Sequence, residues 1–80
     1  MDDPIRIDAR GMRCPRPVVE LAKAARRYPP GTVLEVQADD LAFDSDVEAW
    51  CSMTGHTLLG RTREGDVVTA TIRFEAASRP

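Results

Sequence analysis

Residues 14–25, Cys-Pro-Arg-Pro-Val-Val-Glu-Leu-Ala-Lys-Ala-Ala, have the pattern of an amphipathic helix that begins at a proline. Its apolar side chains recur at the spacing of one helical face, at Val18, Leu21, Ala22 and Ala25. Pro15 suits the first position of a helix, because its missing N–H has no partner there. We therefore predict a helix with Cys14 as its N-cap, which ends by Tyr28, before Pro-Pro-Gly at 29–31.

The segments on either side of this helix have the pattern of β-strands. Residues 5–9 alternate apolar and polar side chains, with the period of two that is typical of a strand. Residues 32–38 and 57–63 give a second and a third strand. Residues 67–74 alternate strongly and predict a fourth, joined to the third by a tight turn at Glu-Gly-Asp, 64–66.

A second helix is predicted between the second and third strands. Ser45 and Glu48 have the spacing of a capping box, so this helix should begin near Asp46, after a loop over residues 39–44. Gly55 is well placed to end it. The order β-α-β-α-β-β predicts an α/β (α+β) two-layer sandwich. In it, a four-stranded mixed sheet carries both helices on one face.

The composition limits the size and the partners of the protein. Eighty residues are enough for a single domain over 1–80, in which we expect 76–80 to be a loose tail. The net charge of −2 argues against strong direct binding to nucleic acid or to an anionic membrane. No apolar run reaches the length of about 18 residues that a membrane span needs. The sequence begins Met-Asp-Asp-Pro, without a signal-peptide pattern, which predicts a cytoplasmic protein.

Cys14 is the candidate functional residue. The positive end of a helix favours a nearby anion, so a thiol placed there should have a lowered pKa. Arg10, Arg13 and Arg16 flank Cys14, and Arg16 stands in the first helical turn, where carboxylates are the usual choice. A broken local rule is typical of functional sites, and here its benefit would be a positive field around the sulfur.

Two prolines constrain the same turn. Pro15 and Pro17 cannot donate backbone hydrogen bonds, so we expect the sulfur of Cys14 to stay accessible rather than to be wrapped by amides. The competing hypothesis is that Cys14 is a small buried apolar residue at an ordinary helix start.

Cys51 and His56 are predicted to be structural. Cys51 shares a helix face with Val47 and Trp50, which places it in the core. The alternative is that Cys51 is a second sulfur acceptor or a disulfide partner of Cys14. His56 follows the helix-ending Gly55, so a turn role is expected for it.

No metal site is predicted. The two cysteines and one histidine lack the usual ligand spacings. An acidic cluster over 39–46 lacks the calcium-loop pattern, and carboxylates at a helix start need no further reason. Its members are Asp39, Asp40, Asp44 and Asp46.

The sequence resembles the TusA/SirA family of sulfur carriers. Cys-Pro-Arg-Pro at 14–17 fits the family's Cys-Pro-x-Pro signature, and residues 8–13 resemble the segment that precedes it. The resemblance covers nearly the whole chain, because it continues through Pro30-Gly31, Ala38-Asp39-Asp40, Asp46-Val47 and Gly55-His56.

The resemblance implies a two-layer fold and a persulfide on Cys14. The sulfur would come from a cysteine desulfurase or a rhodanese and pass to a downstream acceptor protein. The acceptor would serve tRNA thiolation, molybdenum-cofactor metabolism or sulfur oxidation. Such a protein is a sulfurtransferase-type carrier rather than a turnover enzyme on its own. It is expected to be a monomer without a cofactor.

Two other functions compete with this one. A thiol redox enzyme usually has a resolving cysteine three residues after the first, and here Pro17 occupies that position. A small RNA-binding or regulatory module with a structural Cys14 is the other, although an aromatic-rich strand motif is missing.

Overall fold

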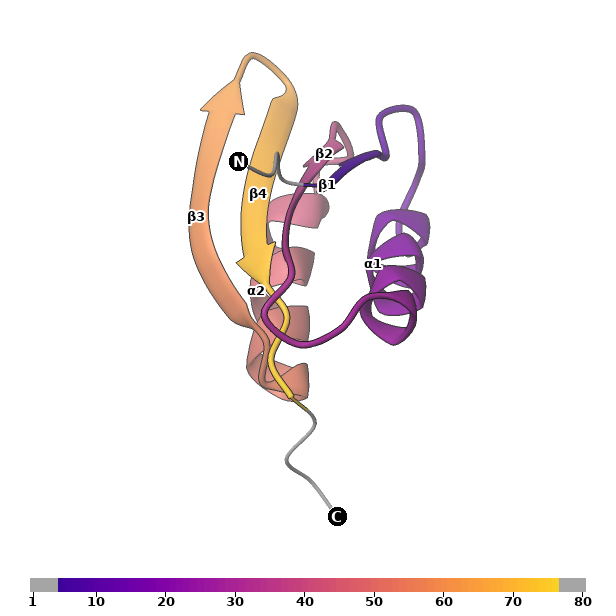
Figure 1. Ribbon diagram of the computed structural model, residues 1–80. Coiled ribbons are helices and arrows are strands. Elements are labelled where there is room, and N and C mark those ends of the chain that lie inside the picture. Colours follow the sequence, from indigo (N-terminus) through magenta and orange to yellow (C-terminus); the bar gives the residue numbers. More distant parts are fainter. Residues whose placement is uncertain (1–4, 77–80) are drawn as a thin grey trace.

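The computed structural model describes residues 5–76, and within them the chain alternates strands and helices around one sheet. The elements are β1 (Ile5–Asp8), α1 (Arg16–Arg27), β2 (Val33–Ala38), α2 (Phe43–Thr54), β3 (Thr57–Glu64) and β4 (Val67–Arg73). The sheet has the strand order β1-β2-β4-β3, with β1 parallel to β2 and the other pairs antiparallel. Figure 1 shows α2 behind the sheet and α1 beside it. The predicted mixed sheet and element order are confirmed.

One face of the sheet is buried, and both helices cover it. Alternate residues of β2 point into the core, and their partners on β4 do the same, as in the pairs Leu34 with Ile72 and Val36 with Ala70. Leu21 of α1 and Val47 of α2 belong to the same buried cluster. Because successive strand residues point to opposite faces, this shared cluster places the two helices on one side.

α1 begins one residue later than predicted. With Cys14 as the N-cap, the first helical residue would be Pro15, but the helix begins at Arg16. Pro15 is the N-cap, and its carbonyl accepts the N–H of Val19 at 3.0 Å. Pro17 lies within the first two helical positions, where a proline costs no backbone hydrogen bond. The helix ends at Arg27, and the extended conformation of Tyr28 confirms the predicted stop.

α2 begins at Phe43, not near Asp46, so the predicted capping box is wrong. The carboxylate of Asp40 accepts the N–H of Ala42 at 3.1 Å, and its carbonyl accepts the N–H of Phe43. Phe43 is buried in the core, which draws the helix start back to it. Ser45 is therefore inside the helix, where its hydroxyl donates to the carbonyl of Ala42.

The end of α2 agrees with the sequence. Gly55 has a φ of 86°, and its N–H donates to the carbonyl of Cys51.

No helix among residues 5–76 is long and apolar enough to cross a membrane. The predicted tail over 76–80 lies, apart from Ala76, outside the described residues.

The edge strand β3 carries charges where the other strands carry apolar side chains. Its register with β4 shifts between Leu58 and Gly60, and beyond this bulge Arg61 and Arg63 lie opposite buried β4 residues. Both guanidinium groups pair with Asp44 of α2, at 2.8 Å from Arg61 and 3.6 Å from Arg63. Inward-pointing charges of this kind discourage further strand pairing at an open edge.

Candidate functional site

Cys14 lies in the turn that leads into α1. The N–H of Arg16 donates to the carbonyl of Arg13 at 2.8 Å, so Cys14 and Pro15 form the middle of this turn, joined by a cis peptide bond. The thiol is free and exposed, which confirms the expected accessibility of the sulfur. It also excludes the hypothesis that Cys14 is a buried apolar residue.

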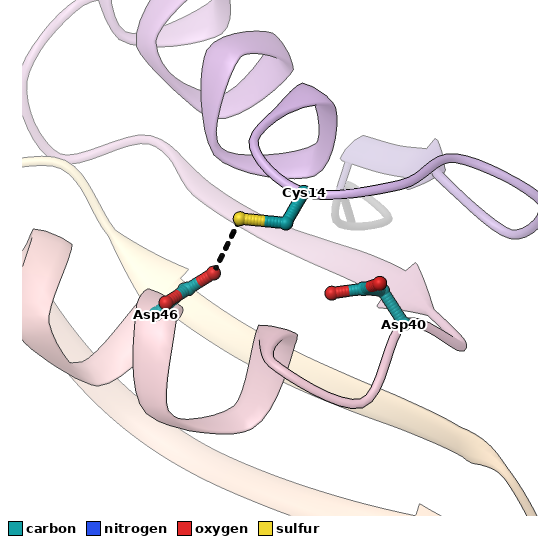
Figure 2. Close-up of side chains that lie close together, drawn as sticks. All are labelled: Cys14, Asp40 and Asp46. Atoms are coloured by element: carbon teal, nitrogen blue, oxygen red, sulfur yellow. Dashed lines mark hydrogen bonds between the residues drawn. The ribbon is translucent and has the colours of Figure 1, made fainter.

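The sulfur faces two carboxylates, one from the loop that follows β2 and one from α2. The thiol of Cys14 donates a hydrogen bond to Oδ2 of Asp46, at 3.2 Å, as Figure 2 shows. Asp40, in the loop between β2 and α2, points toward the same place. The sulfur and one oxygen from each carboxylate all lie within 4.8 Å of one another. This small cluster, Cys14 with Asp40 and Asp46, is called the thiol–carboxylate cluster below.

The electrostatics of the cluster oppose ionisation of the thiol. The hydrogen bond to Asp46 raises the pKa of Cys14 above its ordinary value, and desolvation and the charges of Asp46 and Asp40 act in the same direction. A hydrogen bond from the protonated form and a nearby like charge both disfavour the thiolate. The predicted lowering of this pKa is therefore wrong. A helix end carries a partial charge, whereas Asp46 is a full charge in contact with the sulfur.

The flanking arginines do not surround the sulfur as expected. Arg10 donates to both carboxylate oxygens of Asp8, at 2.8 and 3.0 Å, and holds the pKa of Asp8 at about 2. Its charge is thus paired away from Cys14. Arg13 and Arg16 are exposed on the same turn as Cys14, and neither has an ion pair within residues 5–76.

The loop that carries Asp40 is held against the turn that carries Cys14. Asp39 accepts the N–H of Gly11 through Oδ1 at 2.9 Å, which joins the segments that follow β2 and β1. A hollow of about 380 Å³ lies between these segments. It is lined by Gly11, Met12, Arg13, Asp39, Asp40 and Leu41. The side chain of Leu41 is 88% exposed at this position, although large apolar residues are usually covered.

Cys51 and His56 occupy the structural positions predicted for them. Cys51 is 4% exposed in the core, is a free thiol, and has a pKa raised by burial. The Nδ1 atom of His56 accepts the N–H of Glu75 at 3.0 Å. Its ring lies 5.1 Å from the rings of both Trp50 and Phe74. His56 thus joins α2 to the residues that follow β4, which is a structural role.

The sequence interpretation missed the meeting of Cys14 with Asp46. It explained the acidic cluster as carboxylates placed at the start of a helix. That explanation accounts for Asp46 within α2 but not for its hydrogen bond with Cys14. A usable signal was present, because the predicted order β-α-β is typical of two parallel strands joined by a helix. The segments that follow two parallel strands meet at one edge of a sheet. The turn with Cys14 follows β1, and the loop with Asp40 follows β2.

The chain is similar over most of its length to proteins that are named as putative sulfur carriers. The family model described as sulfurtransferase TusA matches residues 5–74. "Putative sulfur carrier protein YrkI" of Bacillus subtilis is 42% identical over 62 residues, which are 78% of this chain and 83% of YrkI. "Putative sulfur carrier protein YrkF" of the same organism is 39% identical over 69 residues, 86% of this chain. The chain spans only 37% of the length of YrkF.

A solved structure has the same fold. The crystal structure of a SirA-like protein from Desulfitobacterium hafniense superposes with a TM-score of 0.78 and 26% sequence identity. The match covers 90% of this chain and 99% of that one. The two-layer arrangement predicted from the sequence is therefore shared with a SirA-like protein.

Proposed function

The chain belongs to the TusA family of sulfurtransferases, and we propose that it carries sulfur as a persulfide on Cys14. A sulfur-carrier role follows from the family and implies contact with a sulfur donor and a sulfur acceptor. The observation that supports Cys14 as the carrying residue is its exposed thiol at the start of α1. The other cysteine, Cys51, is enclosed in the core and offers no path for a protein partner.

The transfer needs only the sulfur atom of Cys14. The thiolate attacks the outer sulfur of a persulfide on the donor, and a new S–S bond forms as the donor's S–S bond breaks. The donor cysteine leaves as a thiolate and takes up a proton, equivalent to the one that Cys14 lost. In the next transfer, the acceptor's thiolate attacks the outer sulfur on Cys14 in the same way. Neither step has a net oxidation or reduction.

The donor that fits this chemistry is a protein that bears a persulfide, either a cysteine desulfurase or a rhodanese. The acceptor is a protein of tRNA thiolation, molybdenum-cofactor metabolism or sulfur oxidation. An accessible sulfur on a stiff turn suits delivery into the active site of another protein. Pro15 and Pro17 support an exposed position of the sulfur. Each proline ring fixes its own backbone φ, so the turn is stiff and does not fold over Cys14.

The proposed function is tested by loading with labelled sulfur. The wild-type protein is incubated with a cysteine desulfurase and ³⁵S-cysteine, and protein-bound label is measured before and after reduction. We expect label that dithiothreitol removes. Cys14→Ser should reduce the label to background, because it leaves no accessible sulfur nucleophile.

Cys51→Ser is the matched control, and it should load as the wild type does, since its side chain is enclosed. If Cys14→Ser loads as well as the wild type, Cys14 is not the carrier. Loading that requires Cys51 but not Cys14 would keep the sulfur-carrier role and refute the residue assignment. Both variants are first compared with the wild type by circular dichroism to confirm that they fold.

A further inference from the structure

The carboxylate of Asp46 has a contact that its place in α2 does not explain. Acidic side chains are common in the first turn of a helix, where they favour the helix dipole or accept backbone N–H groups. Asp46 has its own N–H in the helix, donating to the carbonyl of Ala42 at 2.9 Å. Within residues 5–76, the hydrogen bond that its carboxylate accepts comes from the thiol of Cys14. The carboxylate is therefore committed to the functional sulfur.

We propose that Asp46 is a positioning residue that holds Cys14 protonated in the free carrier, until a cationic side chain of a docking partner pairs with this carboxylate. The inference rests on the proposed function, because it concerns control of the same sulfur. It assigns to Asp46 a role in partner selection and leaves the transfer step to Cys14.

The charges around the sulfur support a suppressed resting state. Asp46 from α2 and Asp40 from the β2–α2 loop both face it, and a thiolate between them would be a third negative charge. Asp39 accepts the N–H of Gly11 through its carboxylate and extends the same acidic edge. On the sulfur's own segment, Arg10 is paired with Asp8, and the exposed Arg13 and Arg16 are the remaining cations.

A protonated thiol protects the carrier between transfers. The thiolate is the form that reacts with oxidants and alkylating agents, so a raised pKa lowers side reactions of an exposed cysteine. A partner that brings a lysine or arginine to the thiol–carboxylate cluster would neutralise Asp46. The thiol proton would then pass to solvent and leave the thiolate that attacks the donor. An arginine suits the planar carboxylate because it can bind both oxygens.

The test is the pH profile of Cys14 alkylation. Wild type and Asp46→Asn are treated with iodoacetamide over a range of pH, and the modified Cys14 peptide is quantified by mass spectrometry. We expect the midpoint to fall in Asp46→Asn, because the amide removes the negative charge. A fall of one pH unit gives about ten times more thiolate at neutral pH. Because a more acidic thiol is also a weaker nucleophile, the alkylation rate should rise by less than the thiolate fraction, about threefold.

Asp44→Asn is the matched control, because it removes the same charge from the same helix. Asp44 pairs with Arg61 and Arg63 rather than with the thiol, so its midpoint should equal that of the wild type. Asp46→Glu retains the charge and should keep a raised midpoint. Asp40→Asn keeps the hydrogen bond of Asp46 and should lower the midpoint by less. An Asp46→Asn profile equal to those of the wild type and Asp44→Asn overturns the proposal.

The role of the partner is tested by comparing two sulfur donors. With glutathione persulfide, which brings no protein cation, Asp46→Asn should load sulfur about three times faster than the wild type. With a cysteine desulfurase this advantage should disappear, because docking already neutralises Asp46 in the wild type. An equal advantage with both donors would refute partner-dependent release.

The two proposals fail in different ways. If the alkylation profile shifts but Cys14 takes up no sulfur, the proposed function fails and the assignment of Asp46 to the thiol stands. If Cys14 loads sulfur and the profile does not shift, the inference about Asp46 fails alone.

Discussion

At the scale of single residues, the chemistry of Cys14 is decided by which charge is nearest. A helix start and three arginines in sequence argue for an anionic sulfur, yet the sulfur is in contact with Asp46 at 3.2 Å. Electrostatic interactions fall with distance and with exposure to water, so a side chain in contact outweighs exposed ones. The cysteine is therefore accessible, and its contact with Asp46 raises the pKa of its thiol.

The pairing of Arg10 with Asp8 makes a prediction about pH. The guanidinium stabilises the carboxylate and holds the pKa of Asp8 at about 2, so Arg10→Ala should raise that pKa toward its ordinary value. Carboxyl ¹³C chemical shifts followed through an acid titration measure it. Arg6→Ala is the control, because Arg6 pairs with Glu35 and should leave Asp8 unchanged. An unchanged Asp8 titration in Arg10→Ala would show that Arg10 is free to act on Cys14.

At the scale of elements, α2 shows how a local signal is overridden by burial. Ser45 and Glu48 have the spacing of a capping box, but Phe43 lies two residues before Ser45 and is buried. Burying a phenylalanine contributes about 1.5–3 kcal/mol, more than the roughly 1 kcal/mol of a good N-cap. The helix start is therefore set by the burial of Phe43. The carboxylate of Asp40 accepts the N–H of Ala42 in the loop that precedes the helix.

The end of α2 predicts a cost for losing a glycine. Gly55 has a φ of 86°, and a Cβ there would meet no atom within 4 Å, so the cost of Gly55→Ala is one of backbone conformation. We expect the free energy of unfolding to fall by about 1 kcal/mol, measured by urea denaturation. Gly60→Ala, also without a neighbour within 4 Å and without a positive φ, should change it by less than about 0.5 kcal/mol. Equal effects of the two substitutions would contradict this explanation.

At the scale of the whole molecule, the parallel pair of β1 and β2 creates the site. Both helices begin at the same end of the sheet, the upper end in Figure 1. Their starts carry Cys14 and Asp46, which are 32 positions apart in sequence. Because α2 packs on the same face as α1, its first turn faces the turn before α1. The thiol–carboxylate cluster is thus a product of topology and not of any local motif.

This origin explains how much could be predicted from the sequence. Periodicity gave the strands, the length of α1 and the burial of Cys51, because these depend on neighbours in sequence. The place of Cys14 at a helix start singled it out as the candidate functional residue, and the family resemblance narrowed its expected role to that of a persulfide carrier. The hydrogen bond to Asp46 could not be found in this way, since it depends on how two helix starts meet in space. The predicted pKa of Cys14 was wrong for the same reason.

The shared core predicts very different costs for two leucines. Leu21 of α1 is fully buried, with 0% exposure, whereas Leu41 is 88% exposed beside the hollow. Leu21→Ala should lower the free energy of unfolding by about 3 kcal/mol, through lost burial and an unfilled cavity. In a domain of this size that lowers Tm by roughly 12–24 °C. Leu41→Ala should change Tm by no more than about 3 °C, by differential scanning calorimetry. Similar losses in both variants would mean that Leu41 is part of the core.

The proposal that Cys14 carries sulfur is tested by locating the transferred sulfur on the chain. The wild-type protein is loaded by a cysteine desulfurase, its thiols and persulfides are blocked with iodoacetamide, and its peptides are identified by mass spectrometry. The peptide with Cys14 should gain the mass of one sulfur atom, and prior reduction should remove it. The peptide with Cys51 should gain none, because that side chain is buried in the core. An added sulfur found on Cys51, or on neither cysteine, would contradict the claim that Cys14 carries it.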